Sequence, residues 1–264
     1  MTADGPGSTP GGRTPLFKWP LLLAAIFFVD IKRGQSNISY ATKKNAEKMI
    51  KLVLFDIDGT LVDTDAALVK AFQNVFSHFK LRPPTEKEVL RGAGNEEENW
   101  IKLIWTSQEI PSKEKIKEMA EYFRSKYFGF YFPVLARLMP ETKKALKELR
   151  AKGVKTALVT NGRHEYVERV TSYFQLKGLI DYAVSAEDVK QIKPSPEPIK
   201  HALDHFKLKP EEALYVGDTE IDEKAAQAAG VHFALVIHSR NALVHARHKI
   251  SSLTEIPALA ERLA

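Results

Sequence analysis

Residues 50–60 read IKLVLFDIDGT, an apolar run that stops at two aspartates, a glycine and a threonine. The apolar part, 50–55, is rich in Ile, Leu and Val, and a nearly uninterrupted apolar run is typical of a strand buried on both faces. Similar runs recur along the chain, and they predict further strands at 154–159, 180–184, 212–216 and 231–237.

Amphipathic segments separate the later apolar runs. In Glu141–Lys152 the residues Ala145, Leu146 and Leu149 share one side and lysines occupy the other, a pattern typical of a helix that covers a sheet. Helices are predicted at 141–152, 164–174, 196–206 and 222–229. Strands that alternate with helices predict an α/β protein with a Rossmann-like open parallel sheet and helices on both faces.

The stretch 66–134 interrupts this alternation. Apolar side chains recur there at helical spacing, first in Leu68, Phe72, Val75, Phe76 and Phe79 and again in Ile116, Met119, Phe123 and Tyr127. We interpret these stripes as packing residues of a small helical domain inserted after the first strand. The expected organisation is an α/β core of residues 49–65 and 135–264, with the helical insertion at 66–134.

The composition excludes several classes of protein. The 264 residues include 39 basic and 33 acidic side chains, for a net charge of +6, and no cysteine. The lack of cysteine excludes disulfide scaffolds, thiol nucleophiles and cysteine-ligated metal sites. Residues 1–48 hold seven basic and three acidic side chains, so most of the excess charge lies there and the remainder is nearly neutral. We therefore expect no nucleic-acid partner.

The first 48 residues differ in character from the rest. Residues 1–13 are rich in Gly, Pro, Ser and Thr, a composition typical of disorder. The apolar run Leu21–Val29 is far shorter than the roughly 20 residues that span a bilayer, so no membrane association is expected. A secretory signal, a surface-lying anchor and an inert extension are the alternatives. We favour a disordered extension over 1–48, a functional protein that begins near Met49, and a cytoplasmic location.

Polar motifs follow three of the predicted strands. The carboxyl ends of parallel strands meet at one edge of a sheet, where open α/β proteins bind ligands. Four aspartates are expected to gather there: Asp56, Asp58, Asp218 and Asp222. Carboxylates at such density need a cation, and Mg2+ prefers oxygen ligands. With donors around Thr160 and the charge of Lys193, this set is suited to phosphoryl transfer, in which a carboxylate can be the nucleophile.

Four ordered motifs carry a resemblance to a known family: DIDGTLVDT at 56–64, VTNG at 159–162, KPSPE at 193–197 and GDTEID at 217–222. On these motifs, residues 49–264 resemble the haloacid dehalogenase superfamily, in its phosphatase branch and similar to phosphoglycolate phosphatases. The resemblance implies that 66–134 is a helical cap that closes over the crevice and contacts the leaving group. Candidates for substrate contact in this cap are Arg91, Asn95, Trp100, Lys102 and Arg124.

The resemblance also implies roles for single residues. Asp56 resembles the nucleophile that accepts the phosphoryl group, and Asp58 resembles the general acid that later serves as the base. Thr160 and the backbone of Asn161 are implied to hold the phosphoryl oxygens. Lys193 is implied to hold Asp56 and the phosphate against their mutual repulsion.

The implied cofactor is Mg2+. Its expected ligands are the carboxylates of Asp56 and Asp218 and the backbone carbonyl of Asp58, with Asp222 in support, directly or through water. An alternative for Asp222 is a cap of the helix that follows it. We interpret Asp63 as a turn residue rather than a ligand.

The histidines offer a weaker signal. His201 and His205 have the spacing of a zinc-protease pair, but Ala202 stands where the glutamate is needed, so no zinc site is expected. His238 and the other histidines of the C-terminal part are expected to be solvated.

The expected function is Mg-dependent hydrolysis of a small soluble phosphate monoester through an aspartyl-phosphate. Phosphoglycolate-like esters, sugar phosphates and nucleotides all stay open as substrates, and the protein is expected to be a monomer or homodimer. Asp58 argues against the dehalogenase branch, in which no leaving group needs a proton. The alternatives are a sugar-phosphate mutase of the same superfamily and a non-catalytic binding protein that keeps the fold.

Overall fold

Strand β1 (Leu52–Phe55) lies inside a six-stranded sheet in the computed structural model, which describes residues 49–105, 111–238, 241 and 246–263. The predicted extension over 1–48 lies outside the described residues. Every side chain of β1 is buried, as its uninterrupted apolar sequence predicts. Among the described helices, none combines the length and apolarity that crossing a membrane requires.

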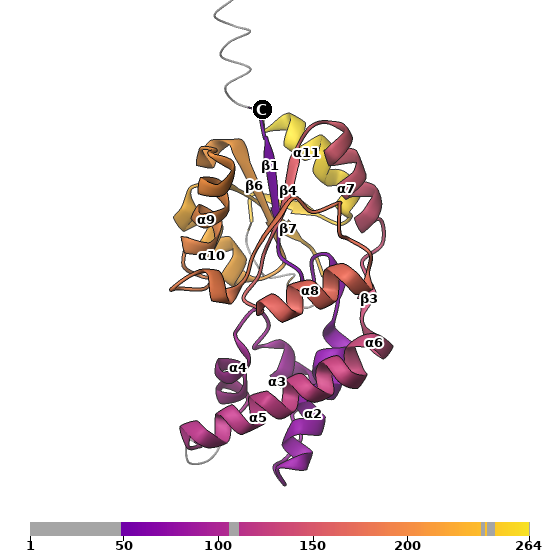
Figure 1. Cartoon of the computed structure of the whole chain (residues 1–264), viewed down its shortest axis with the longest axis vertical. Coiled ribbons are helices and arrows are strands. Elements are labelled where there is room, and N and C mark those ends of the chain that lie inside the picture. Colours follow the sequence, from indigo (N-terminus) through magenta and orange to yellow (C-terminus); the bar gives the residue numbers. More distant parts are fainter. Residues whose placement is uncertain (1–48, 106–110, 239–240, 242–245, 264) are drawn as a thin grey trace, which may run out of the picture. The chain divides into compact units, whose positions relative to one another are not determined.

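All six strands of the sheet run parallel, in the order β5-β4-β1-β6-β7-β8. The chain leaves β1, builds outward through β4 and β5, and then resumes on the other side of β1 (Figure 1). This reversal places a topological switch point beside β1, where open α/β sheets bind ligands. The later strands are β4 (Lys155–Val159), β5 (Tyr182–Val184), β6 (Ala213–Gly217), β7 (His232–Val236) and β8 (His248–Ile250).

Helices cover both faces of the sheet, which confirms the predicted fold class. On one face, Leu52 and Leu54 of β1 share a core with helices α9 (Glu197–Phe206) and α10 (Glu220–Ala229). On the other, Val53 and Phe55 share a core with the remaining helices of the α/β part. These are α7 (Thr142–Ala151), α8 (His164–Tyr173) and α11 (Ile256–Arg262). The side-chain alternation of β1 thus feeds two hydrophobic cores.

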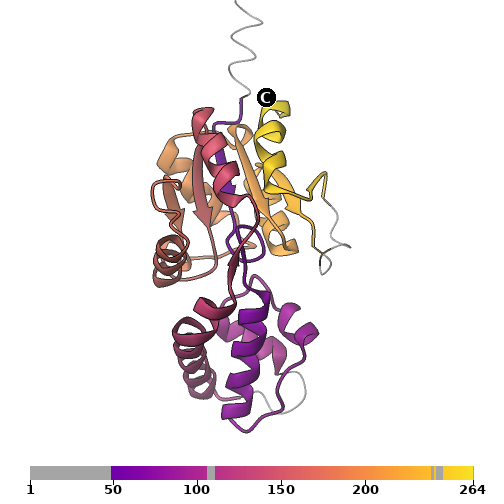
Figure 2. The ribbon, with the colours of Figure 1, turned by 90° about the vertical axis from the view of Figure 1, so that its right-hand side faces the viewer.

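Three strands escaped the sequence analysis because they are too short to form an apolar run. Strand β8 has three residues and only Ile250 is buried. Strands β2 (Val62–Asp63) and β3 (Arg137–Leu138) pair antiparallel in a two-residue ribbon. This ribbon lies where the chain leaves the α/β core for the helical insertion and where it returns (Figure 2).

The helical insertion lies between β2 and β3. Its aromatic stripes pack against each other: the ring centroids of Phe72 and Phe123 are 4.4 Å apart, and those of Phe72 and Trp100 are 4.9 Å apart. The predicted boundaries at 66 and 134 lie next to the ends of these helices, and an independent domain with those limits stays a prediction. The helices are α2 (Asp65–His78), α3 (Glu86–Leu90), α4 (Glu97–Ile104), α5 (Lys113–Lys126), a π-helical segment (Tyr127–Tyr131) and α6 (Phe132–Leu135).

Candidate active site

The turn after β1 places two aspartates at the carboxyl edge of the sheet. The Asp56 amide donates to the carbonyl of Val216 at 2.9 Å, so the residue still belongs to the sheet edge. The chain then reverses, and the amides of Leu61 and Val62 each donate to the Ile57 carbonyl at 3.0 Å. Gly59 has a φ of 77°, a left-handed conformation that glycine adopts without steric cost.

Lys193 is the electrostatic centre of the site. Its ammonium is 2.6 Å from Asp56 Oδ1 and 2.7 Å from Asp222 Oδ1, and it also donates to the Tyr215 hydroxyl at 2.8 Å. Burial lowers the pKa of Lys193, but Asp222 and Asp56 more than offset this effect, so its pKa lies above the ordinary value. Lys193 is therefore a fixed positive charge beside the predicted nucleophile.

Asp222 is held by four hydrogen bonds. Its Oδ1 accepts from Lys193 and from the Tyr215 hydroxyl, and its Oδ2 accepts from the amide and the hydroxyl of Thr219. Burial opposes the ionised form of Asp222, but Lys193 and these donors hold its pKa below the ordinary value. The Thr219 hydroxyl accepts from the Asp222 amide in return, which makes a capping box at the start of α10. Asp222 thus combines the helix-cap alternative with a charge contact.

Glycine at position 217 makes this close approach possible. A Cβ atom at Gly217 would lie 2.5 Å from the Cβ of Asp222, a distance that side chains do not tolerate. The glycine of the GDTEID motif therefore lets the first turn of α10 pack against the end of β6. The predicted start of this helix at 222 is two residues late, because Thr219 is the N-cap residue and α10 begins at Glu220.

Asp218 completes a cluster of three buried carboxylates. One oxygen from each of Asp56, Asp218 and Asp222 lies within 4.8 Å of the others. Burial raises the pKa of Asp56 to about 7, against the lowering effect of Lys193, and burial raises the pKa of Asp218 well above its ordinary range. The ammonium of Lys193 contacts two of these carboxylates, Asp56 and Asp222. A divalent cation that prefers oxygen ligands fits this set of donors.

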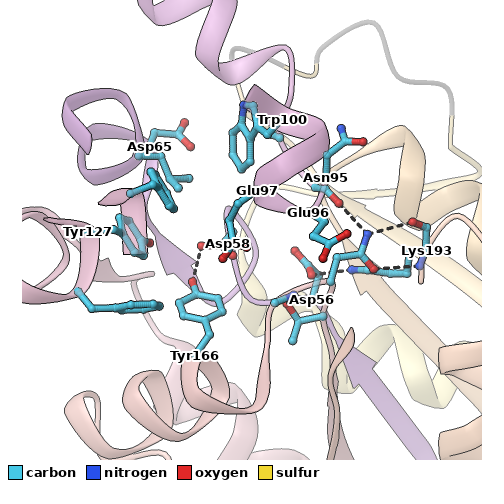
Figure 3. A pocket seen from close by; sticks show the side chains of 18 residues that line it. Asp56, Asp58, Asp65, Asn95, Glu96, Glu97, Trp100, Tyr127, Tyr166 and Lys193 are labelled. Atoms are coloured by element: carbon cyan, nitrogen blue, oxygen red, sulfur yellow. Dashed lines mark hydrogen bonds and ion pairs between the residues drawn. The ribbon is translucent and has the colours of Figure 1, made fainter. Parts of the chain in front are cut away.

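The Asp58 side chain lies apart from that cluster and points into the pocket. Its Oδ1 accepts hydrogen bonds from the Thr64 hydroxyl at 2.6 Å and from the Tyr166 hydroxyl, the latter shown in Figure 3. Neither donor was predicted from the sequence. Tyr166 lies within an ordinary amphipathic helix, α8. The only available signal was that a buried tyrosine hydroxyl needs a partner. The implied metal contact of Asp58 uses its backbone carbonyl and stays a prediction.

The Asn161 side chain forms hydrogen bonds with both the α/β core and the helical insertion. Its side-chain oxygen accepts from the Lys193 amide at 2.9 Å, and its side-chain nitrogen donates to the Lys193 carbonyl at 2.9 Å and to the Gly94 carbonyl at 2.7 Å. The neighbouring Thr160 hydroxyl accepts from the Gly162 amide at 3.0 Å. The sequence predicted a backbone role for Asn161, and this side-chain contact with the segment between α3 and α4 was not foreseen.

Two residues after β7, His238 and Asn241, form hydrogen bonds with the loops that follow β1 and β6. The Asn241 side chain donates to the Asp218 carbonyl at 2.7 Å and accepts from the His238 amide at 2.7 Å. The His238 ring makes a hydrogen bond with the Gly59 carbonyl. His238, which was expected to be solvated, is therefore half-buried and hydrogen-bonded, because the segment after β7 meets the turn after β1.

The predicted substrate candidates fall in different places. Asn95 and Trp100 line the pocket above Asp56 and Asp58, whereas Arg91 lines a separate groove beside Asp218. Arg124 forms an ion pair with Glu97 at 3.3 Å. Lys102 lines neither cavity among the described residues.

The histidine pair at 201 and 205 belongs to a packing contact. The rings of Tyr182 and His205 stack with centroids 3.7 Å apart, and the Tyr182 hydroxyl is 3.4 Å from His201 Nδ1. Within the described ranges, the carboxylate cluster at the sheet edge is the group with metal-binding geometry.

The sequence profile of the haloacid dehalogenase-like hydrolase family matches residues 53–236. This chain belongs to that family. The PpaX protein of Caldanaerobacter subterraneus subsp. tengcongensis, which carries a pyrophosphatase name, is 35% identical over 188 residues, 71% of this hydrolase and 81% of its own length. The phosphoglycolate phosphatase of Haemophilus influenzae (strain 86-028NP) is 31% identical over 185 residues, 68% of this hydrolase and 82% of its own length.

Solved structures agree with this assignment. A haloacid dehalogenase superfamily hydrolase from Geobacter sulfurreducens PCA is 27% identical, with a TM-score of 0.62 over 80% of this chain and 99% of that chain. Family membership and the phosphatase names of the relatives confirm the resemblance inferred from the four motifs and the prediction of a phosphatase enzyme.

Proposed function

We propose that this hydrolase cleaves a small soluble phosphate monoester with the help of Mg2+, through an aspartyl-phosphate on Asp56. One observation carries the proposal: Lys193 lies buried between Asp56 and Asp222, with Asp218 beside them, at the edge of the sheet that opens into the pocket. The phosphatase names of the relatives support the reaction class.

In the first step, a carboxylate oxygen of Asp56 attacks phosphorus and forms a P–O bond. The ester P–O bond breaks, and its electron pair stays on the departing alcohol oxygen, which receives a proton from Asp58. Lys193 faces Asp56 and lowers the repulsion between this carboxylate and the phosphoryl oxygens. Thr160 and the Asn161 backbone are expected to hold those oxygens, and both residues line the same pocket as Asp56.

In the second step, water attacks the phosphorus of the aspartyl-phosphate while Asp58 takes the water proton. The bond between phosphorus and Asp56 breaks, which releases inorganic phosphate and restores both carboxyl groups. We infer that the Asp58 carboxyl group carries the proton in each step, and that the Thr64 and Tyr166 hydroxyls, which donate to its Oδ1, hold it in position.

The expected metal ligands are Asp56 and Asp218, together with the Asp58 carbonyl. Asp222 already accepts four hydrogen bonds, so we assign it a supporting role. When bound, Mg2+ supplies positive charge that offsets the phosphoryl group and the clustered carboxylates. The helical insertion is proposed to exclude water from the first step as a cap. The cytoplasmic location and the monomeric or homodimeric state stay predictions.

The test is hydrolysis of an aryl phosphate by purified protein with and without Mg2+. Asp56→Asn is expected to lower kcat at least about 1,000-fold, because the amide cannot serve as the nucleophile. Asp63→Asn is the matched control, since Asp63 is exposed seven positions further along the same motif and its contact is with the Asp65 amide. Substantial turnover by Asp56→Asn would contradict the nucleophile assignment.

Two other outcomes separate the alternatives. Transfer of phosphate between positions of one sugar without release of inorganic phosphate would indicate a mutase. No turnover of any ester on a broad panel would favour a non-catalytic binding protein.

A further inference from the structure

Resting on the proposed function, we propose that the alcohol part of the substrate carries a positive charge. The substrate class is a phosphate monoester of an amino alcohol, with a primary or quaternary ammonium group near the ester. The side chains that the helical insertion contributes to the pocket carry this inference.

Carboxylates dominate the charge on the insertion side of the pocket. Asp65 at the start of α2, and Glu96 and Glu97 at the start of α4, all line the cavity. Figure 3 shows Glu96 and Glu97 extending from the insertion toward Asp56 and Asp58. Among the described residues that line this pocket, Lys193 is the one cationic side chain, and it is held by Asp56 and Asp222. The leaving group therefore faces negative charge.

Nearby arginines do not reverse this balance. Arg124 neutralises Glu97 in part, at 3.3 Å, and Arg163 pairs with Glu187 at 2.9 Å. Burial still raises the pKa of Glu97 above its ordinary value, and the neighbouring Glu96 adds to this effect. A ligand cation would favour the ionised form of Glu97, whereas a ligand anion would oppose it.

Aromatic rings form the rest of the wall. Trp100, Phe123, Tyr127 and Phe128 all line the cavity. Aromatic faces attract ammonium groups, and an ammonium enclosed by rings and carboxylates is a recurrent mode of recognition. A neutral, hydroxyl-rich sugar would bury its hydroxyls against these rings at a cost.

The Tyr127 hydroxyl could accept a hydrogen bond from a ligand. Tyr127 is 3% exposed, and its buried hydroxyl forms no hydrogen bond of normal geometry with a described residue. The Tyr166 and Thr64 hydroxyls lie close to it, but both donate their protons to Asp58. Buried polar atoms are seldom left without a partner. An ammonium N–H of the substrate can donate to this oxygen, whereas a quaternary ammonium would contact the ring face.

The proposed substrate differs from the substrates that appear in the names of the relatives. Glycolate and inorganic phosphate, the leaving groups of phosphoglycolate and pyrophosphate, are both anionic. Such a group would lie beside Glu96 and Glu97, where like charges repel at low dielectric. We therefore expect both compounds to be poor substrates here.

Three esters of similar size test the charge preference: O-phosphoethanolamine, propyl phosphate and 2-phosphoglycolate. We expect kcat/KM for phosphoethanolamine to exceed that for propyl phosphate at least about tenfold, and that for phosphoglycolate at least about 100-fold. Phosphocholine against its neutral isostere 3,3-dimethylbutyl phosphate repeats the comparison for a quaternary ammonium. Equal or reversed rankings in both sets would overturn the inference.

Glu96→Gln ties the preference to the pocket. It is expected to lower the ratio of kcat/KM for phosphoethanolamine over propyl phosphate about three- to tenfold, as expected for loss of one ion pair. Glu98→Gln makes the same change on the same helix outside the pocket lining, and its ratio should match the wild type. An unchanged ratio in Glu96→Gln would contradict the assignment of Glu96.

The two proposals fail in different ways. If the protein hydrolyses aryl phosphate but shows no preference for cationic esters, only the substrate class is overturned. If the purified protein hydrolyses no phosphate ester at all, the proposed function itself is overturned.

Discussion

The α/β core and the helical insertion both contribute to one pocket, but they place their side chains by different means. In the core, Asp56, Thr160 and Asp218 each follow the end of a parallel strand, and the sheet itself brings them together. In the insertion, Glu97 and Trp100 lie on a helix, where the packing of neighbouring helices decides which side faces the pocket. The core therefore holds the residues proposed for the chemistry, and the insertion holds the residues proposed for substrate choice.

Lys193→Met is expected to have the largest effect, and it acts on the α/β core. It leaves Asp56 and Asp222 buried without their cation, so we expect kcat to fall at least about 1,000-fold. The free energy of unfolding should fall by about 3–5 kcal/mol, measured by chemical denaturation. Lys190→Met, at an exposed position nearby, should leave both quantities close to wild type. Retention of a tenth of the activity by Lys193→Met would refute its assigned role.

Asp218→Asn, also in the α/β core, is expected to lower the activity without lowering the stability. We expect kcat to fall at least about 100-fold, because a metal ligand is lost. Without Mg2+ the variant should be at least as stable as the wild type, because the substitution removes a buried carboxylate that lies beside those of Asp56 and Asp222.

Thermal unfolding with and without Mg2+ gives the second readout for this variant. Mg2+ should raise the Tm of the wild type, since a ligand that binds the folded state stabilises it, and should raise the Tm of Asp218→Asn much less. An equal rise in both proteins would show that Asp218 is not a ligand.

Tyr166→Phe has the smallest expected effect on kcat. It tests the contact between the Tyr166 hydroxyl and Asp58, at the side of the pocket where the α/β core meets the helical insertion. Loss of one donor to Asp58 should lower kcat about tenfold, while KM and stability change little. Tyr173→Phe, on the exposed side of the same helix, removes a hydroxyl that donates to the Pro133 carbonyl and should have no effect on kcat. A fall in stability without a change in kcat would indicate a structural role only.

The same comparison explains what could be predicted from the sequence. The catalytic candidates follow apolar runs, and strand ends in a parallel sheet share one edge, so residues as distant as Asp56 and Asp218 could be grouped without a structure. Tyr166 could not be found, because nothing in an amphipathic helix tells which buried hydroxyl meets Asp58. The pocket carboxylates Glu96 and Glu97 look like ordinary first-turn residues of a helix, where acidic side chains are common.

Asp222 shows a third case, in which one carboxylate has two kinds of contact. The sequence offered helix capping and metal support as alternatives. The structure gives this carboxylate a capping box and an ion pair together, and metal support stays a prediction. One oxygen serves each contact, so neither use excludes the other.

The side chain of Asn161 bears on the cap movement proposed above. Its amide nitrogen has two hydrogens: one is donated to the Lys193 carbonyl in the α/β core, and the other to the Gly94 carbonyl in the insertion. In the proposed movement, water would replace the Gly94 carbonyl with a hydrogen bond of nearly equal strength. The pairing of Asn161 with Lys193 would survive, so the insertion could separate from the core at a low energetic cost and without disturbing Lys193.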